Sequence, residues 1–197
     1  MVTSSGHSHP HEPAPLADAS VRRATHTDAP AVGIVQEAVW QETYAPRVPA
    51  DIAAQFRAAD FASVWRRSLQ DPPPGIWRLL VACAGAQVVG YAAIGPSQDI
   101  DGEPTTGSLL EIGVHPAGRR SGHGSRLLNA AADILREAGA TELTAWLPAD
   151  AEATRAFFGH SGMHPDGAYR DRAVTEDVTI REIRVAATLV DPTDGDE

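Results

Sequence analysis

The sequence predicts a single α/β domain with six or seven strands and four helices. Segments of alternating or continuous apolar character are interleaved with segments whose apolar residues repeat at helical spacing. Glycine and proline residues separate most of them, and no internal repeat is visible along the 197 residues. The expected order is strand, two helices, three strands, helix, strand, helix, strand. A further strand near Tyr169 would make seven.

The first half of the chain is expected to contain a short strand, then two helical regions, and then two strands that pair with each other. The expected elements are a strand at 21–24, a helix starting near Pro30, a helical region at 50–69, and strands at 77–83 and 87–94. Valines between 32 and 39 recur at helical spacing, and Thr27 or Asp28 is suited to cap their helix. The run 71–75 contains three prolines, which end the second helical region.

The second half is expected to alternate strands with helices after a polar loop. The expected elements are a loop at 97–107, a strand at 108–114, a helix ending before Gly139, a strand at 142–147, a helix at 151–160 and a strand at 178–189. Leu127, Ala131 and Ile134 recur at helical spacing, and a glycine follows them as a helix stop. Asp150 is suited to cap the helix at 151–160.

Charge and composition exclude several classes of function. The formal net charge is -10, so neither a nucleic-acid surface nor a membrane surface is expected, because both need a basic face. No apolar run reaches the roughly 20 residues of a membrane helix, and the chain does not begin like a secretory signal. The single cysteine, Cys83, has no internal disulfide partner, which favours a cytoplasmic location.

The two ends of the chain are expected to lie outside the folded domain. Residues 1–19 are rich in Ser, His, Pro and Ala without periodicity, which predicts a disordered tail. Residues 191–197 are predicted to form an acidic C-terminal tail. The domain is therefore expected to span 20–190. The histidines between 7 and 11 are interpreted as solvated tail residues, and no metal is expected.

The most informative segment follows the strand at 108–114. That strand stops before a proline, and a turn rich in glycine and arginine leads into an amphipathic helix. Amides at a helix start lack internal partners, and the helix dipole adds positive charge there, so the turn predicts a pyrophosphate site. Its glycines admit close backbone approach, and its histidine is expected to contribute an amide. The candidate phosphate-binding residues are Arg119, Arg120, Gly122, His123, Gly124 and Ser125.

This turn resembles the phosphate turn of the GNAT superfamily of N-acetyltransferases, which has the pattern Arg/Gln-x-x-Gly-x-Gly/Ala. Arg119, Gly122 and Gly124 match the pattern. Residues 155–163 look like the family segment that ends in Phe-Tyr-x-x-x-Gly-Phe, and residues 40–49 look like a bacterial subgroup. The resemblance covers nearly the whole expected domain. It implies the GNAT-type acyl-CoA N-acyltransferase fold, with a mixed central sheet of six to seven strands flanked by about four helices.

The resemblance implies a reaction as well. An acetyl or other acyl group would pass from acetyl-CoA to a primary amine of a small molecule or peptide, by direct attack on the thioester. The pantetheine arm would lie between the fourth and fifth strands, pair with Ile112, Gly113 and Val114, and contact Phe158. An amide near Val114 would polarise the thioester carbonyl. No metal is implied, and the oligomeric state stays open, with a homodimer as one alternative.

The chain departs from the family at the acid and at the base. Phe158 replaces the family's tyrosine and cannot donate a proton to the thiolate. Another group or water must do so, or transfer is slow. The family's carboxylate base falls at Ser108, whereas Glu111 lies three residues later. Glu111 is the candidate base, acting through a water, with an ion-paired strand residue as the alternative. The alternative acids are His160, His164 and Tyr169, which are otherwise surface residues.

Other features leave alternatives open. Trp40, Tyr44 and Trp65 either wall an acceptor pocket or belong to the core. The acidic residues between 99 and 103 either attract a cationic acceptor or form a solvated loop. Two rival functions remain: a non-catalytic acyl-CoA-binding module, which Phe158 motivates, and a nucleotide- or phosphate-binding protein that uses the same turn.

Overall fold

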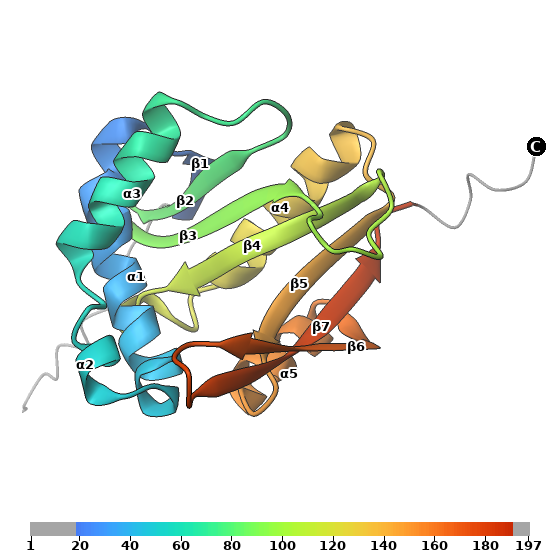
Figure 1. The fold of residues 1–197 in the computed structure, drawn as a ribbon. Helices are drawn as coiled ribbons and strands as arrows, with labels where there is room; N and C mark the ends of the chain where they lie inside the picture. Colours follow the sequence, from blue (N-terminus) through green and yellow to red (C-terminus); the bar gives the residue numbers. More distant parts are fainter. Residues whose placement is uncertain (1–18, 191–197) are drawn as a thin grey trace, which may run out of the picture.

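One seven-stranded sheet runs through the computed structural model, which describes residues 19–190 (Figure 1). The strands are β1 (Ala19–Arg23), β2 (Arg78–Ala84), β3 (Gln87–Pro96), β4 (Thr106–Val114), β5 (Glu142–Pro148), β6 (His164–Ala173) and β7 (Thr179–Thr188). Their spatial order is β1-β2-β3-β4-β5-β7-β6. Neighbours β4 and β5 are parallel, and the other neighbouring pairs are antiparallel. The mixed sheet is confirmed, and β6 is the additional strand near Tyr169.

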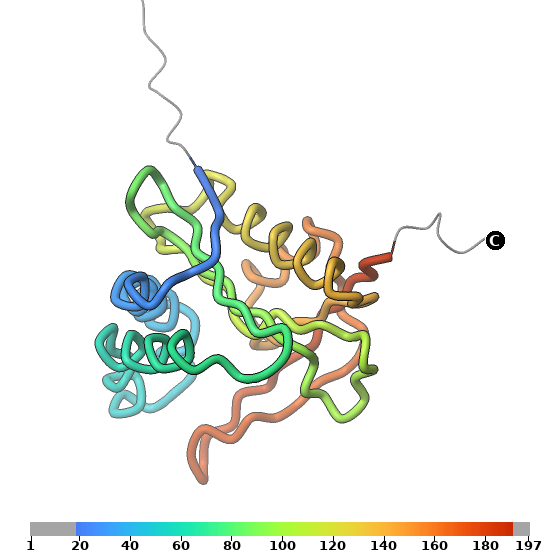
Figure 2. Tube along the Cα trace, turned by 90° about the horizontal axis from the view of Figure 1, so that it is seen from above, coloured from blue at the N-terminus to red at the C-terminus, as the bar shows by residue number. Residues whose placement is uncertain are grey.

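Helices cover both faces of this sheet. They are α1 (Ala29–Thr43), α2 (Ala50–Ala53), α3 (Ala58–Gln70), α4 (His123–Glu137) and α5 (Glu152–His160). Helices α1 and α3 pack together on one face, and α4 lies on the other, with the sheet between them (Figure 2). Among the described residues, no helix is both long and apolar enough to cross a membrane. The predicted terminal tails lie outside the described residues, apart from Ala19, which begins β1.

Two apolar cores fill the space between these layers. The larger core lies between the sheet and α4 and α5, and includes Leu109, Leu127 and Phe158. The smaller core lies under α1 and α3, and includes Val35 and Tyr91. On the α1 side, no helix of the described chain lies over β5 and β7 (Figure 1).

The single helical region expected at 50–69 is wrong. The structure divides it into α2 and α3, and the buried Phe56 lies in the break. The first amide of α3, at Ala58, donates to the Glu37 carboxylate of α1 at 3.0 Å. At Gly33 of α1, a Cβ would lie 2.3 Å from the Ala58 carbonyl oxygen. Contact with α1 therefore sets where α3 begins, and a local helical pattern does not contain that information.

The two aspartates expected as helix caps have different partners. Asp28 occupies the N-cap position of α1, but its carboxylate accepts hydrogen bonds from Arg22 at 2.7 and 2.8 Å and from the Thr25 amide at 2.7 Å. Asp150 precedes the N-cap residue of α5 and pairs with Arg47 at 2.8 Å. The Asp28 carboxylate thus belongs to a capping box with Thr25 at the 3-10 helix His26–Asp28 and does not cap α1. The Asp150 carboxylate ties neighbouring segments together and does not cap α5.

Replacing Asp28 with asparagine is expected to lower the free energy of unfolding by about 1–3 kcal/mol at neutral pH. The Arg22 guanidinium and the Thr25 amide hold the pKa of Asp28 well below its usual range. A depressed carboxylate pKa stabilises the fold above about pH 4, and this contribution is lost as the pH falls toward the folded-state pKa. Urea unfolding between pH 3 and 8 measures the effect.

The matched control is Asp60→Asn, because Asp60 and Arg57 are exposed and 4.0 Å apart. Exposed pairs of this kind contribute little to stability. Equal losses in the two variants, or a loss for Asp28→Asn that does not shrink at low pH, would contradict the assignment.

Candidate functional site

The parallel strands β4 and β5 separate halfway along their length. They pair only from Thr106–Leu109 against Glu142–Ala145, whereas β4 stays paired with β3 as far as Val114. Strand β5 stays paired with β7 as far as Pro148, and Figure 1 shows β4 and β5 running apart. One edge of β4 beyond Leu109 thus has no strand partner among the described residues. The gap that the resemblance implied is present, with an open backbone edge on which an extended ligand can pair.

A β-bulge in β4 turns Glu111 to the α1 side of the sheet. The pairing of β4 with β3 shifts between Leu109 and Glu111, so Leu110 has no partner in the register. In a regular strand, residues two apart face the same side, and Leu109 faces the α4 core. The extra residue reverses that alternation. Glu111 therefore reaches α1, on the opposite face from Leu109.

The Glu111 carboxylate is the centre of a hydrogen-bond network that links four elements, α1, α3, β3 and β4. Its Oε1 accepts from the Tyr91 hydroxyl at 2.6 Å, from the Trp40 indole N–H and from Gln36 Nε2 at 3.1 Å. Its Oε2 accepts only from Gln36 Nε2, at 3.0 Å, among the residues described. The Gln36 carbonyl oxygen accepts in turn from Trp65 Nε1 at 2.6 Å. The network holds the Glu111 carboxylate in place, and its Oε2 can still accept a further hydrogen bond.

Burial governs the acid–base properties of this network. Desolvation raises the pKa of Glu111 above its ordinary value, and the hydrogen bonds from Tyr91, Trp40 and Gln36 oppose the rise. Burial also raises the pKa of Tyr91 well above its usual range, and the negative charge of Glu111 adds to the effect. A carboxylate with a raised pKa is suited to accept a proton near neutral pH.

The predicted phosphate turn lies at the start of α4. Gly122 is the N-cap residue with φ of 78°, a left-handed conformation that glycine adopts without strain. The first hydrogen bond at this end runs from the Arg126 amide to the Gly122 carbonyl, at 3.1 Å. The amides of His123, Gly124 and Ser125 precede it and have no intrahelical acceptor. The His123 ring is buried and Ser125 is exposed, so the imidazole faces the protein rather than a ligand.

The two arginines of the turn differ in their surroundings. Arg119 folds back over the end of β4, where its Nε donates to the Val114 carbonyl at 3.1 Å and its Nη2 pairs with Glu42 at 2.5 Å. Arg120 is exposed and has φ of 65°. Arg119 thus lies between the turn and the open edge of β4.

The two phenylalanines of α5 face different surroundings. Phe158 is 2% exposed and belongs to the large core. Its neighbour Phe157 lies against the turn, because a Cβ at Gly124 would be 3.2 Å from the Phe157 ring. Sequence reasoning assigned cofactor contact to Phe158, and that contact stays a prediction. The sequence left open whether Phe157 packs on the cofactor arm or on the core, since a family pattern does not show which of two adjacent helical residues faces the turn.

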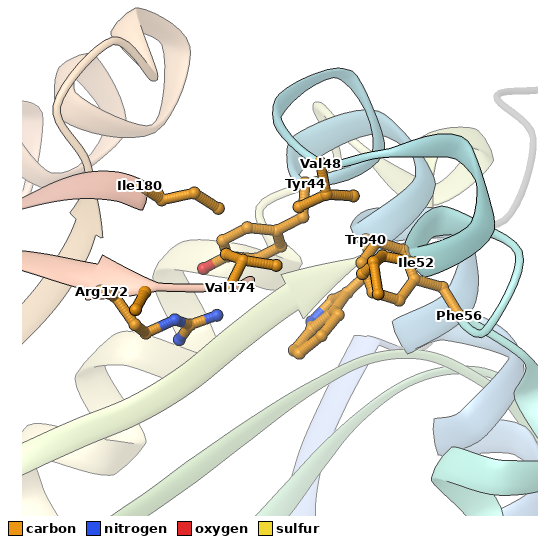
Figure 3. A pocket seen from close by; sticks show the side chains of 9 residues that line it. Trp40, Tyr44, Val48, Ile52, Phe56, Arg172, Val174 and Ile180 are labelled. Carbon is orange, nitrogen blue, oxygen red and sulfur yellow. The ribbon is translucent and has the colours of Figure 1, made fainter. Parts of the chain in front are cut away.

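A pocket lies between α1 and the β6–β7 hairpin (Figure 3). We call it the hairpin pocket; it is lined by Trp40, Tyr44, Val48, Ile52, Phe56, Arg172, Ala173, Val174 and Ile180. Trp40 belongs both to this wall and to the Glu111 network, so the pocket adjoins Glu111. Trp40 and Tyr44 are thus pocket residues as well as packing residues, whereas Trp65 packs against the smaller core and bonds Gln36.

A buried ion cluster on β6 and β7 was not found from the sequence. Glu182 is 1% exposed and accepts from Arg170 Nε at 2.6 Å, and Arg172 lies 3.5 Å from it. Glu182 and Arg184 alternate along β7, and the partners of Glu182 lie on the neighbouring strand β6, whereas Arg184 also reaches the loop before β4. Arg184 pairs with Asp99 at 3.2 Å and with Asp101 at 2.7 Å. Arg184 therefore offsets only part of the negative charge of the acidic loop, in which Glu103 is exposed.

The alternative proton donors lie away from the Glu111 network. His160 is exposed, and its Nδ1 bonds the Ala156 carbonyl within α5 at 2.6 Å. His164 is exposed on β6, and the Tyr169 side chain is 66% exposed beneath Arg181. Ser108, where the family places a base, is buried and bonds Thr144 at 2.9 Å. None of the hydrogen bonds within residues 19–190 connects these side chains to Glu111.

Solved structures support the fold. An N-acetyltransferase from Staphylococcus aureus Mu50 is 18% identical with a TM-score of 0.66, covering 88% of this chain and 99% of that one. The ribosomal-protein-S18-alanine N-acetyltransferase of Escherichia coli is 18% identical with a TM-score of 0.63, covering 91% and 99%. A protein from Salmonella typhimurium, determined with its cofactor acetyl-CoA, is 19% identical with a TM-score of 0.62, covering 90% and 98%. No curated protein sequence matches the chain.

A family model matches most of the domain. The matched residues are 36–163, which run from Gln36 of the Glu111 network, through the open edge of β4 and the phosphate turn, to the end of α5. The matched description is the acetyltransferase (GNAT) family. With the mixed sheet, the divergence of β4 from β5 and the glycine turn at α4, the match shows that this chain belongs to the GNAT acetyltransferase family.

Proposed function

We propose that the protein transfers an acetyl group from acetyl-CoA to a primary amine. The observation that carries the proposal is the continuity of three features: the turn at α4, the open edge of β4 and the Glu111 carboxylate at its bulge. Family membership supports acyl transfer. The acetyl-CoA in the similar Salmonella typhimurium structure supports the choice of cofactor.

The residues of the site fit an acyl-CoA. Amides of His123, Gly124 and Ser125 would hold the pyrophosphate, with Arg119 released from Glu42 to add charge. The backbone of Ile112–Val114 would pair with the pantetheine arm, because this edge of β4 lacks a strand partner in the described chain. Phe157 and Phe158 would border the arm. Bound acetyl-CoA supplies the activated acyl group, and no protein nucleophile is needed.

Glu111 is the proposed base. Its Oε2 is the acceptor with spare capacity, and the raised pKa of Glu111 favours uptake of a proton from an ammonium, directly or through a water. Proximity of the amine to the acyl carbon would supply much of the remaining rate. Phe158 leaves no tyrosine in the family's acid position, so we propose that water protonates the sulfur.

Release of free thiol from acetyl-CoA with a panel of amines tests the proposal. Amine-dependent release, together with mass-spectrometric detection of the acetylated amine, is the expected result. Tight CoA binding without transfer to any amine would favour the non-catalytic rival. Thermal stabilisation by ATP or NAD but not by acetyl-CoA would instead favour the nucleotide-binding rival.

The rate of transfer at saturating substrate is expected to fall as the pH drops through the raised pKa of Glu111, because only the carboxylate accepts a proton. Tyr91→Phe should shift this acidic limb of the pH profile, in which kcat falls, to higher pH. The Tyr91 hydrogen bond stabilises the charged form of Glu111, so its loss raises the pKa of Glu111 further. Profiles of kcat against pH for the two proteins measure the shift. A purely structural role for Tyr91 would lower activity without moving the limb, which would remove Tyr91 from the positioning role.

A further inference from the structure

We propose that the amine acceptor is a small apolar α-amino acid, whose side chain fills the hairpin pocket and whose carboxylate pairs with Arg172. This inference rests on the proposed acetyl transfer and specifies its substrate class. The size of the pocket, its lining, its one charged side chain and its position beside Glu111 each contribute to the argument.

The hairpin pocket has the size and chemistry of a site for one apolar side chain. Its volume is about 200 Å³, below the roughly 300–1,000 Å³ of pockets for drug-sized ligands. Aromatic and aliphatic side chains form the wall, and Figure 3 shows them on both sides of the space. Trp40 packs edge-on against Phe56 with ring centroids 5.1 Å apart, so the aromatic wall is preformed. Burying an apolar group here would contribute to binding.

The charge of the lining selects against long cationic acceptors. Among the nine lining residues, Arg172 is the one charged side chain, and none is a carboxylate. A polyamine would place a second ammonium beside a guanidinium, which costs binding energy. A substrate anion at this position is favoured instead.

Arg172 is positioned to receive that anion. Its Nη1 lies 3.5 Å from Glu182, while Arg170 binds the same carboxylate at 2.6 Å. The Arg172 guanidinium lies over the Tyr44 ring, with Cζ 5.6 Å from the centroid, and points into the pocket (Figure 3). Within the described part of the chain it has no closer polar partner. Its remaining N–H groups can bind a carboxylate in the bidentate geometry that arginine favours.

Glu111 carries the opposite charge and lies next to the hairpin pocket, on the far side of Trp40. Trp40 lines the pocket and donates its indole N–H to Glu111, so the carboxylate lies directly behind the pocket wall. Burial raises the pKa of Tyr44 to about 12, and the charges of Glu182, Arg172 and Glu111 all act on its hydroxyl. The Tyr44 hydroxyl thus lies among these charges. An ammonium toward Glu111 and a carboxylate toward Arg172 match a zwitterion.

The reaction balances for such a substrate. The ammonium loses one proton to Glu111 and then to solvent, and its lone pair attacks the thioester carbonyl carbon. The C–N bond forms as the C–S bond breaks, and the second nitrogen proton ends on the CoA thiol by way of water. The products are an N-acetyl amino acid and CoA.

Acetylation of matched substrates by the full-length protein tests the inference. Free thiol and acetylated product are measured with L-phenylalanine, with L-leucine, with phenethylamine, which lacks the carboxylate, and with spermidine. We expect the two amino acids to give kcat/KM at least 10-fold above the values for the other amines. Equal or better acetylation of phenethylamine or spermidine would overturn the amino-acid assignment and leave acetyl transfer standing. No transfer to any amine, with acetyl-CoA bound, would remove the proposed function and the inference together.

Arg172→Gln is the decisive variant. Loss of a charge-assisted pair is expected to raise the KM for L-phenylalanine about 10- to 100-fold. The KM for acetyl-CoA should stay unchanged, and Arg172→Lys should recover part of the loss. The matched control is Arg181→Gln, because Arg181 lies on the same hairpin, pairs with Asp171 and is largely exposed. An unchanged KM for L-phenylalanine in folded Arg172→Gln would overturn the role of Arg172.

Discussion

Gly124→Val is expected to weaken acetyl-CoA binding by about 100-fold or more, which corresponds to roughly 3 kcal/mol. Gly124 lies in the first turn of α4, where its amide has no intrahelical acceptor. A Cβ at this position would already lie 3.2 Å from the Phe157 ring, and the larger valine side chain would crowd the surface that the phosphates approach. Isothermal titration with acetyl-CoA measures the loss.

The control for this variant is Gly159→Ala in the adjacent helix α5. A Cβ at Gly159 meets nothing within 4 Å, so this substitution should leave both the fold and the affinity unchanged. Circular dichroism and the melting temperature show whether Gly124→Val remains folded. A folded Gly124→Val protein with wild-type affinity would mean that the cofactor does not approach this turn.

Glu111→Gln is expected to lower kcat by about 100-fold or more and to leave acetyl-CoA affinity within about twofold, because general-base catalysis contributes roughly 10²–10⁴. Glutamine keeps the length of the side chain but cannot take up a proton. Its amide would also place a second donor beside Gln36 Nε2, so unfolding must be measured in parallel. Steady-state rates against amine concentration at neutral pH give the result.

Glu103→Gln provides the matched control for Glu111→Gln, since Glu103 lies in the loop before β4 and is exposed. It should retain the wild-type kcat. If a folded Glu111→Gln protein has an unchanged kcat, Glu111 is a structural residue that holds α1 and β3 to β4. Such a result would leave cofactor binding at the α4 turn untouched.

The glycine turn at the start of α4 could be predicted from sequence because its determinants are local. Gly122 and Gly124 lie two residues apart, directly between a strand and an amphipathic helix, and dihedral freedom and unpaired amides follow from that arrangement alone. Most strands could also be placed along the chain, since they carry apolar patterns, whereas β6 is largely exposed and lacks one. The start of α3 could not be predicted, because it depends on contact between Gly33 and Ala58, which are far apart in sequence.

The orientation of the Glu111 side chain could not be predicted from sequence, for a different reason. Period-two alternation would place Glu111 on the same side as Leu109, in the α4 core. The unpaired Leu110 reverses that orientation, and nothing in the residue pattern of β4 marks the bulge. Arg172 and Glu182 were missed for a similar reason. Tyr44 approaches Arg172 only when the β6–β7 hairpin folds beside α1, and Arg170 lies opposite Glu182 only when β6 pairs with β7. The sequence therefore indicated the backbone of the turn at the start of α4 better than the contacts of Glu111 and Arg172.

A crystal structure of the protein soaked with acetyl-CoA tests the central claim most directly. The account predicts diphosphate oxygens within hydrogen-bond distance of the amides of His123, Gly124 and Ser125. It also predicts the pantetheine arm alongside the unpaired edge of β4. Density for the diphosphate at another surface, or a bound cofactor that leaves these three amides facing solvent, would contradict it.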